Sequence, residues 1–295
     1  MPSSNVQWFP GHMAKTRKLI AENLKNVDIV IELLDARIPY SSRNPEIVSL
    51  KEGKPSVIIL NKASLSDPEQ NKLWSVYYSS ENTACIMADC ITGKGIQDIL
   101  PCVKNILKEK TDKYDAKGMS GRKLYAMVLG IPNVGKSTLI NKLCGAKKAK
   151  AEDRPGVTLD KQWVSTGIGI DLLDMPGILW PKFEDKEVGE NLAFTGAVKD
   201  SIIDIEYLAM RLCAKLRVLY PDLLCQRYRL GDISEYKDFD DYDLLCAIGK
   251  KRGFLVSGGE VDTVRTSNIL LDEFRSARIG RITLERPETC KEKRG

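Results

Sequence analysis

The sequence lacks the features that mark secreted, membrane-spanning and zinc-stabilised proteins. Its 8 cysteines form no Cys-x-x-Cys pair, which argues for reduced thiols and against disulfides or structural zinc. The most apolar stretch, residues 29–34, is interrupted by Glu32 and is far shorter than the roughly 20 residues that cross a bilayer. Residues 1–10 resemble neither a secretory signal nor a transit peptide. We therefore expect a cytoplasmic protein with no membrane partner.

Composition and charge indicate an ordinary folded chain with a modest basic excess. Of the 295 residues, 43% are hydrophobic and 29% are charged, which excludes disorder, collagen and a small disulfide scaffold as descriptions of the whole chain. The length allows two domains. Residues 1–179 carry 25 basic and 19 acidic side chains, and residues 180–295 carry 20 and 21. So small an excess is by itself weak support for a nucleic-acid partner.

Apolar runs and periodic stretches alternate along the first 180 residues. Strands are expected at residues 28–34, 56–60, 84–87, 124–129, 162–166 and 169–173. Helices are expected among them, at residues 12–25, 68–79 and 95–108 and from about Lys136. The alternation predicts an α/β fold with helices on both faces of the sheet and with the first three strands parallel.

The pattern changes twice along the chain. Residues 109–122 are polar, without an apolar period, and are expected to be a linker. Beyond Trp180 the spacing becomes helical, at residues 188–219, where Pro221 ends the segment, and at residues 240–249 and 263–279. We predict a first domain at residues 1–179 and a mostly helical second domain at residues 180–295.

The strongest motif is Gly130-Ile-Pro-Asn-Val-Gly-Lys-Ser-Thr138, which fits the P-loop pattern between a strand and a helix. Its amides and the helix N-terminus offer donors to phosphates. Lys136 would neutralise the β- and γ-phosphates, and Ser137 would offer its hydroxyl to Mg²⁺. The motif therefore predicts a nucleotide site that includes Asn133, Val134, Gly135, Lys136, Ser137 and Thr138.

Two later motifs complete a phosphoryl-transfer site. Asp174, in Asp174-Met-Pro-Gly177, ends an apolar strand, which suits an acid that contacts Mg²⁺ through water. The Gly177 amide would meet the γ-phosphate. Thr158 lies in an irregular polar stretch between a helix and a strand, where a mobile loop could bring a second hydroxyl to Mg²⁺. The predicted metal ligands are Ser137, Thr158 and Asp174.

Asn61 and Lys62 directly follow a predicted strand, at the place where GTPases carry Asn-Lys-x-Asp to recognise guanine. The fourth residue here is Ser64, whose hydroxyl cannot replace a carboxylate that accepts bonds from both guanine N1 and N2. Charge-assisted bonds contribute roughly 1.5–3 kcal/mol, so selectivity is expected to fall by an order of magnitude or more. Asp67 replaces the missing carboxylate only if the loop folds back. An enzyme that uses ATP therefore remains an open alternative.

The remaining base contact is expected from Ala88 and Asp89. They follow the strand at residues 84–87, where a loop can pack its backbone against the base.

The base-recognition pair precedes the P-loop, whereas the usual small G protein has it afterwards. In this order the chain resembles the circularly permuted GTPases of the YlqF-related group. The resemblance rests on residues 8–15, 35–39, 61–62, 130–138, 156–158 and 174–177. The helical remainder is also similar to the C-terminal domain of that family.

The resemblance implies a GTPase that hydrolyses GTP to GDP and phosphate as an assembly factor for the large ribosomal subunit. It implies that Asp35 and Arg37 organise nearby loops. It also implies RNA contact by the C-terminal domain, whose candidate basic contacts are Lys250, Lys251, Arg252, Arg275, Arg278 and Arg281. The alternative is a GTP-dependent signalling switch that binds a protein effector without RNA.

Activation of the attacking water needs a group other than the usual glutamine, because Ile178 stands in its place. A lone histidine is more often structural than catalytic, but the resemblance implies that His12 positions the water. Asn133, by resemblance to cation-dependent GTPases, would hold a K⁺ ion near the phosphates, and the two roles are compatible. Residues 174–177 also lead almost directly into the second domain. A change of the bound nucleotide is therefore expected to rotate the helical domain.

Overall fold

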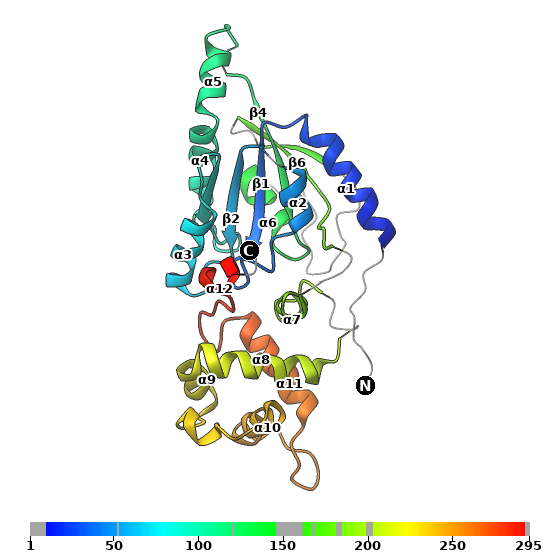
Figure 1. The fold of residues 1–295 in the computed structure, drawn as a ribbon, viewed down its shortest axis with the longest axis vertical. Coiled ribbons are helices and arrows are strands. Elements are labelled where there is room, and N and C mark those ends of the chain that lie inside the picture. The colour runs from blue at the N-terminus through cyan, green and yellow to red at the C-terminus, as the bar shows by residue number, and fades with distance from the viewer. Residues whose placement is uncertain are drawn as a thin grey trace.

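The computed structural model describes residues 10–51, 53–119, 121–145, 162–166, 169–180, 185–198 and 203–292, with the side chains of residues 14–290 within those ranges. A sheet flanked by helices forms one part of the molecule, and a bundle of helices forms the other (Figure 1). Among the described residues, no helix combines the length and the apolar character that a membrane span requires.

The sheet has six strands in the order β3-β2-β1-β4-β6-β5. All neighbours are parallel except β5, which runs antiparallel to β6. This confirms the predicted α/β class and the three parallel strands at the start of the chain. The strands are β1 (Ile29–Asp35), β2 (Ser56–Asn61), β3 (Thr83–Met87), β4 (Leu124–Gly130), β5 (Gln162–Ser165) and β6 (Ile170–Asp174).

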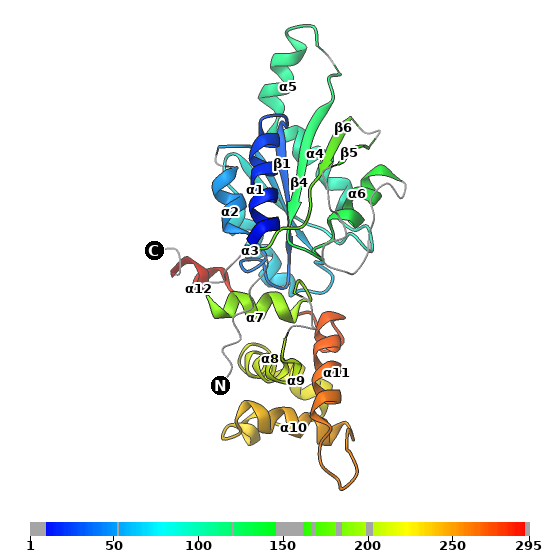
Figure 2. The same cartoon turned by 90° about the vertical axis from the view of Figure 1, so that its right-hand side faces the viewer.

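Alternation of side chains along the strands gives the sheet two apolar faces. Val30 faces the cluster that contains Ile20 and Ile47, from α1 (Pro10–Leu24) and α2 (Pro45–Leu50). Its neighbours on β1 face a cluster that includes residues of α4 (Ile99–Ile106) and α6 (Lys136–Cys144). Figure 2 shows α1 and α2 on one side of the sheet and α6 on the other. The predicted helices on both faces are therefore present, together with α3 (Pro68–Tyr78).

The segment predicted as a linker is partly helical, which corrects that expectation. Helix α5 (Lys108–Asp115) continues the direction of α4 away from the sheet (Figure 1). Lys110 forms an ion pair of 2.6 Å with Asp28, just before β1, and Arg122 lies over the Tyr114 ring. Polar side chains anchor this helix in place of an apolar face, so the hydrophobic pattern could not reveal it.

The C-terminal helices follow the predicted order, but the stretch predicted at residues 188–219 forms two helices, and the helices at residues 221–228 and 287–292 were not predicted. Pro221 ends α8 but also begins α9, because proline is well suited to the first turn of a helix. The last helix, α12, returns to the sheet, and Cys290 packs in a cluster with Trp74 of α3. The bounds are α7 (Lys186–Phe194), α8 (Ile205–Leu219), α9 (Pro221–Tyr228), α10 (Asp241–Lys251), α11 (Thr263–Arg275) and α12 (Pro287–Glu292).

A hydrophobic core runs without interruption from the sheet into these helices. One cluster of buried side chains includes Leu33 of β1, Leu192 of α7, Leu212 of α8 and Leu270 of α11. The division at residue 180 stays a prediction, because the two parts share this core.

Residues 281–285, named here the return segment, bring the chain back from the helical part to the sheet. The Ile282 amide donates to the Leu65 carbonyl at 3.2 Å, and the Leu284 amide donates to the Arg37 carbonyl at 2.8 Å. The Thr283 hydroxyl donates to the carbonyl of Ala36 at 3.1 Å. The return segment is thus hydrogen-bonded to the loops that follow β1 and β2.

Glu285 closes the return segment with a buried carboxylate. It accepts hydrogen bonds from the amides of Tyr40 (2.6 Å) and Ser41 (3.0 Å), from the Ser41 hydroxyl, and from the Asn191 side chain (2.9 Å). Burial raises the pKa of Glu285, although these donors act in the opposite direction. The loop after β1, the return segment and α7 therefore meet at one carboxylate.

We expect Glu285→Ala to lower the free energy of unfolding by at least about 2 kcal/mol, because several buried donors lose their acceptor. Glu285→Gln keeps one acceptor oxygen and should lose less. Urea denaturation measures both, with Glu288→Ala, at an exposed position, as the control. Equal stability of the alanine variant and the wild type would contradict this role.

The same carboxylate predicts a dependence on pH. Because the pKa of Glu285 is raised above its ordinary value of 4.5, the folded protein binds the proton more tightly than the unfolded chain does. The stability difference between wild type and Glu285→Gln should be most favourable to the wild type below pH 4.5, and should decrease as the pH rises through the raised pKa. Denaturation midpoints of the two proteins over a pH series check the sign.

Candidate nucleotide-binding site

The predicted P-loop lies at the junction of β4 and α6, at the carboxyl edge of the parallel strands. Gly130 and Gly135 have positive φ angles of 157° and 107°. A Cβ on Gly130 would lie 2.7 Å from the Leu33 carbonyl oxygen, and one on Gly135 would collide with the Asn61 amide. Both positions require glycine, and the N-terminus of α6 is left open to an anion.

Lys136 and Asp174 place opposite charges beside this loop. The Lys136 ammonium donates to the carbonyls of Gly130 (3.1 Å) and Ile131 (3.0 Å). Burial lowers its pKa to about 8, and burial also raises the pKa of Asp174 to about 6, while each charge opposes the shift of the other. The two groups are therefore desolvated, and a bound polyphosphate and cation would complement them.

The donor set fits a hard cation such as Mg²⁺. Val128 of β4 pairs with Asp174 of β6, so the carboxylate lies on the strand next to the P-loop strand. Asp174 Oδ1 is buried and has no hydrogen-bond partner within the described part of the chain. Ser137, at the start of α6, offers a hydroxyl. Thr158, the third predicted ligand, lies outside the described residues.

Gly177 lies close to the P-loop, and its predicted contact with the γ-phosphate stays a prediction. A Cβ at this position would lie 2.9 Å from the Lys136 ammonium and 3.0 Å from Pro132. Ile178 is buried beneath α1 in the cluster with Ile20. An apolar, buried side chain at residue 178 cannot orient a water molecule, as expected.

Asn61 connects the P-loop to the two predicted base loops. Its side-chain amide donates to the Val134 carbonyl at 2.6 Å, and its side-chain oxygen accepts from the Cys90 amide at 3.0 Å. The residue is 2% exposed. The three loops that the sequence assigns to phosphate and base thus share one buried side chain.

Lys62 and Asp35 extend this arrangement to the loop after β1. The Lys62 ammonium lies 3.1 Å from Asp35, which also accepts from the Arg37 guanidinium at 2.7 and 2.9 Å. Burial alone would raise the pKa of Asp35, but the charges of Arg37 and Lys62 hold it well below its usual range. Arg37 also donates to the Arg275 carbonyl at 3.2 Å. The predicted organising role of Asp35 and Arg37 has a clear structural basis.

Ser64 and Asp89 lie together, whereas Asp67 points elsewhere. The exposed Ser64 hydroxyl donates to Asp89 Oδ2, and the Ala63 amide donates to the Ala88 carbonyl at 3.1 Å. Asp67 caps α3 by accepting from the Glu69 amide at 2.9 Å, and it accepts from the Tyr220 hydroxyl at 2.9 Å. With both oxygens engaged, Asp67 does not compensate for Ser64.

Of the two residues expected to activate the water, only Asn133 has a side chain within the described part of the chain. His12 lies within α1, but its side chain is outside the described residues. Asn133 has φ 57°, and its amide donates to the Gly196 carbonyl after α7 at 2.9 Å. Asn133 therefore connects the P-loop to the helical part, and its role toward K⁺ stays a prediction.

Three of the arginines predicted as RNA contacts are engaged within the chain, and their contact with RNA stays a prediction. Arg252 forms an ion pair of 3.4 Å with Glu273. Arg275 donates to the carbonyls of Ala193 and Phe194, both at 3.0 Å. Arg281, in the return segment, donates to the carbonyls of Ala63 (2.7 Å) and Ser66 (2.9 Å). The contacts of Arg275 and Arg281 span 81 residues or more, so no local pattern could have identified them.

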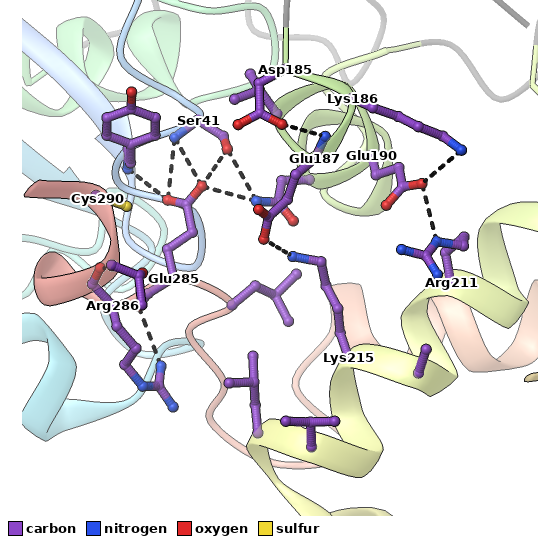
Figure 3. Close-up of a pocket in the computed structure, with 18 residues that line it drawn as sticks. Ser41, Asp185, Lys186, Glu187, Glu190, Arg211, Lys215, Glu285, Arg286 and Cys290 are labelled. Carbon is purple, nitrogen blue, oxygen red and sulfur yellow. Dashed lines mark hydrogen bonds and ion pairs between the residues drawn. The ribbon is translucent and has the colours of Figure 1, made fainter. Parts of the chain in front are cut away.

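A hollow of about 690 Å³ lies between α7, α8 and the return segment, away from the P-loop (Figure 3). Its charged walls pair with each other. Lys215 lies 2.5 Å from Glu187, and Arg211 lies 3.1 Å from Glu190. These pairs hold α7 against α8, and we assign no ligand to the hollow.

Comparisons with known proteins agree with this geometry. A family described as "50S ribosome-binding GTPase" matches residues 125–220. Ribosome biogenesis GTPase A of Bacillus pumilus is 47% identical over 284 residues, which are 96% of this chain and 99% of the relative. Mitochondrial ribosome-associated GTPase 1 of Mus musculus is 32% identical over 297 residues, 95% of this chain and 90% of that protein. The crystal structure of GNP-bound YlqF from T. maritima matches with a TM-score of 0.60 and 25% identity, over 93% of this chain and 99% of that chain.

We expect Asn61→Asp to weaken both the fold and nucleotide binding. The new carboxylate oxygen would face the Val134 carbonyl in place of a donor, at a loss of about 1–3 kcal/mol in unfolding free energy. Nucleotide affinity should fall at least about tenfold, because the P-loop and the base loops lose their connection. Asn105→Asp, at an exposed position on α4, serves as the control for added charge. Unchanged affinity in a folded Asn61→Asp protein would show that the connection is dispensable.

Proposed function

The chain belongs to the family of ribosome biogenesis GTPase A proteins, and we propose that it hydrolyses GTP to GDP and phosphate to assist assembly of the large ribosomal subunit. One observation supports the chemistry above all others. The P-loop lies between Asn61, which joins it to the base loops, and Asp174, whose buried oxygen suits a cation. The names of the relatives and the 50S description of the matching family support the ribosomal partner. A cytoplasmic location is part of this proposal.

The residues of this chain divide the catalytic tasks among them. The P-loop amides of Asn133, Val134 and Gly135 and the α6 N-terminus bind the phosphates, and Lys136 neutralises the developing charge. Ser137, Thr158 and Asp174 would hold Mg²⁺, which would supply further charge neutralisation when bound. His12 positions the attacking water, and Asn133 would hold a K⁺ ion that would add positive charge near the phosphates. The apolar Ile178 makes the intrinsic rate slow, so the ribosomal partner accelerates it.

The helical part supplies a basic surface for ribosomal RNA. A hollow of about 720 Å³ lies between α9, the end of α10 and residues 278–280. Arg227 and Arg252 in its wall pair with Glu273. The exposed side chains of Arg229, Lys251 and Arg278 have no ion pair or hydrogen bond to any described residue. RNA phosphates would complete their coordination.

Contacts between the sheet and the helical part would transmit a change of the bound nucleotide to this surface. The Asn133 side chain bonds to the Gly196 carbonyl at the end of α7, and α7 packs against α8 through the pairs in Figure 3. Residues 174–177 offer the second route that the sequence predicts. A change at the γ-phosphate would therefore displace the helices that carry the basic hollow.

Steady-state GTP hydrolysis in Mg²⁺ and K⁺ buffer should increase at least about tenfold when purified large ribosomal subunits are added. Small subunits are the control. His12→Ala and withdrawal of K⁺ should each reduce the stimulated rate. Absence of stimulation, with subunits that stimulate a known factor, would favour an effector-binding switch. Better turnover of ATP than of GTP would overturn the GTPase assignment.

Removal of the exposed basic side chains should weaken subunit binding without affecting nucleotide binding. We expect the triple variant Arg229→Ala, Lys251→Ala, Arg278→Ala to reduce the slope of log affinity against log salt by roughly 2–3, since each lost phosphate contact removes about 0.7–0.9. The matched control carries Lys104→Ala, Lys113→Ala and Lys117→Ala, at exposed positions on and after α4 and α5. An equal loss in both variants would place the contact elsewhere.

A further inference from the structure

The absence of a carboxylate at residue 64 leaves the recognition of guanine unexplained, and the proposed GTPase needs it. Met87, at the end of β3, pairs in parallel with Leu60 of β2. The loops after these strands therefore leave the sheet side by side. The Ala63 amide bonds to the Ala88 carbonyl, and Asn61 accepts from the Cys90 amide. Asp89 is thus held in the same pair of loops as Ser64.

The hydrogen bond between Ser64 and Asp89 has a defined direction. An ionised carboxylate can only accept, so the serine hydroxyl donates its proton to Asp89 Oδ2. Although burial alone would raise it, the bonds from Ser64 and from the amides of Thr92 and Ile91 lower the pKa of Asp89. With its proton engaged, Ser64 Oγ presents only lone pairs outward.

The second oxygen of Asp89 fixes the orientation of the carboxylate. Oδ1 accepts from the amides of Ile91 and Thr92, both at 2.9 Å. The Asp89 amide donates to the Lys94 carbonyl at 2.9 Å, which closes the loop. The residue is 4% exposed. Oδ2 therefore lies in a loop closed by hydrogen bonds, and it is the atom toward which the Ser64 hydroxyl points.

The return segment holds the Ser64 loop from the other side. Arg281 donates to the carbonyls of Ala63 and Ser66, and the Ile282 amide donates to the Leu65 carbonyl. All three carbonyls that flank Ser64 are therefore bound. The position of the hydroxyl is set before any ligand arrives, which limits the entropy lost on binding.

We propose that Ser64 Oγ and Asp89 Oδ2 together accept the hydrogen bonds of guanine N1–H and N2–H, so that Asp89 supplies the carboxylate missing from residue 64. Guanine presents two neighbouring donors on this edge. Adenine presents an acceptor at N1 and no amine at C2, and would leave both acceptors unpaired. The proposal rests on the GTPase function above and assigns the base specificity of that same site.

The test is displacement of a fluorescent GDP analogue by GDP, ADP, IDP and XDP, with Mg²⁺ present. The wild type should bind GDP at least about tenfold more tightly than ADP or IDP, since IDP lacks the N2 amine. Asp89→Asn should lose at least about tenfold in GDP affinity and gain XDP affinity, because its amide can donate to the xanthine O2. Asp67→Asn, in the same loop but engaged as the α3 cap, should leave the GDP to XDP ratio unchanged.

An exchange of the two residues makes the test independent of folding losses. Ser64→Asp alone would bring two carboxylates together and should not improve GDP binding. Ser64→Asp combined with Asp89→Ser returns the carboxylate to residue 64 and should restore GDP selectivity. This non-additivity is the signature of a shared acceptor pair.

The outcomes separate the two proposals. A wild type that prefers GDP, with Asp89→Asn and the exchange variant unchanged in base preference, would overturn the Asp89 assignment and leave the GTPase intact. A wild type that binds ADP as tightly as GDP would overturn both. A loss of all diphosphates equally in Asp89→Asn would indicate a structural role and would also count against the assignment.

Discussion

The nucleotide site depends on the two hydrogen bonds of one buried amide. Asn61 donates to the P-loop at Val134 and accepts from the loop after β3 at Cys90. No charged side chain could do both, because a carboxylate lacks the donor and an ammonium lacks the acceptor. The parallel sheet brings the three loops to one edge, and Asn61 then fixes their separation. In the proposed site, different loops hold the base and the phosphates, so this separation determines whether one nucleotide can contact both.

The second constraint is the way the helical part is attached. Arg37 and Arg281 each bind backbone carbonyls across the junction, and Glu285 binds backbone amides. These charged groups satisfy main-chain atoms that loops would otherwise leave unpaired. The helices therefore act as part of the wall around the base loops, and any displacement of the helices changes the environment of residues 61–66.

Much of this could be predicted from the sequence, because the sheet strands are short apolar runs and the P-loop has a fixed spacing. The order of Asn61, the P-loop and Asp174 also predicted which residues meet at the sheet edge. Helix α5 was missed because Lys110 and Asp28 stabilise it without an apolar face. The roles of Arg281 and of the Ser64–Asp89 pair depend on contacts between distant or neighbouring loops. Such contacts follow from the tertiary fold and leave no periodic signal.

The position of the return segment has a consequence for the synthesis of the chain. Arg281 and its partner Ser66 are separated by 215 residues, so a ribosome makes the base loops long before it makes the groups that hold them. The sheet can form around β1, β2 and β4 while the helical part is still being translated. Full rigidity of the base loops must wait until residues 281–285 emerge. The nascent protein therefore acquires the final form of its proposed nucleotide site only after residues 281–285 have been translated.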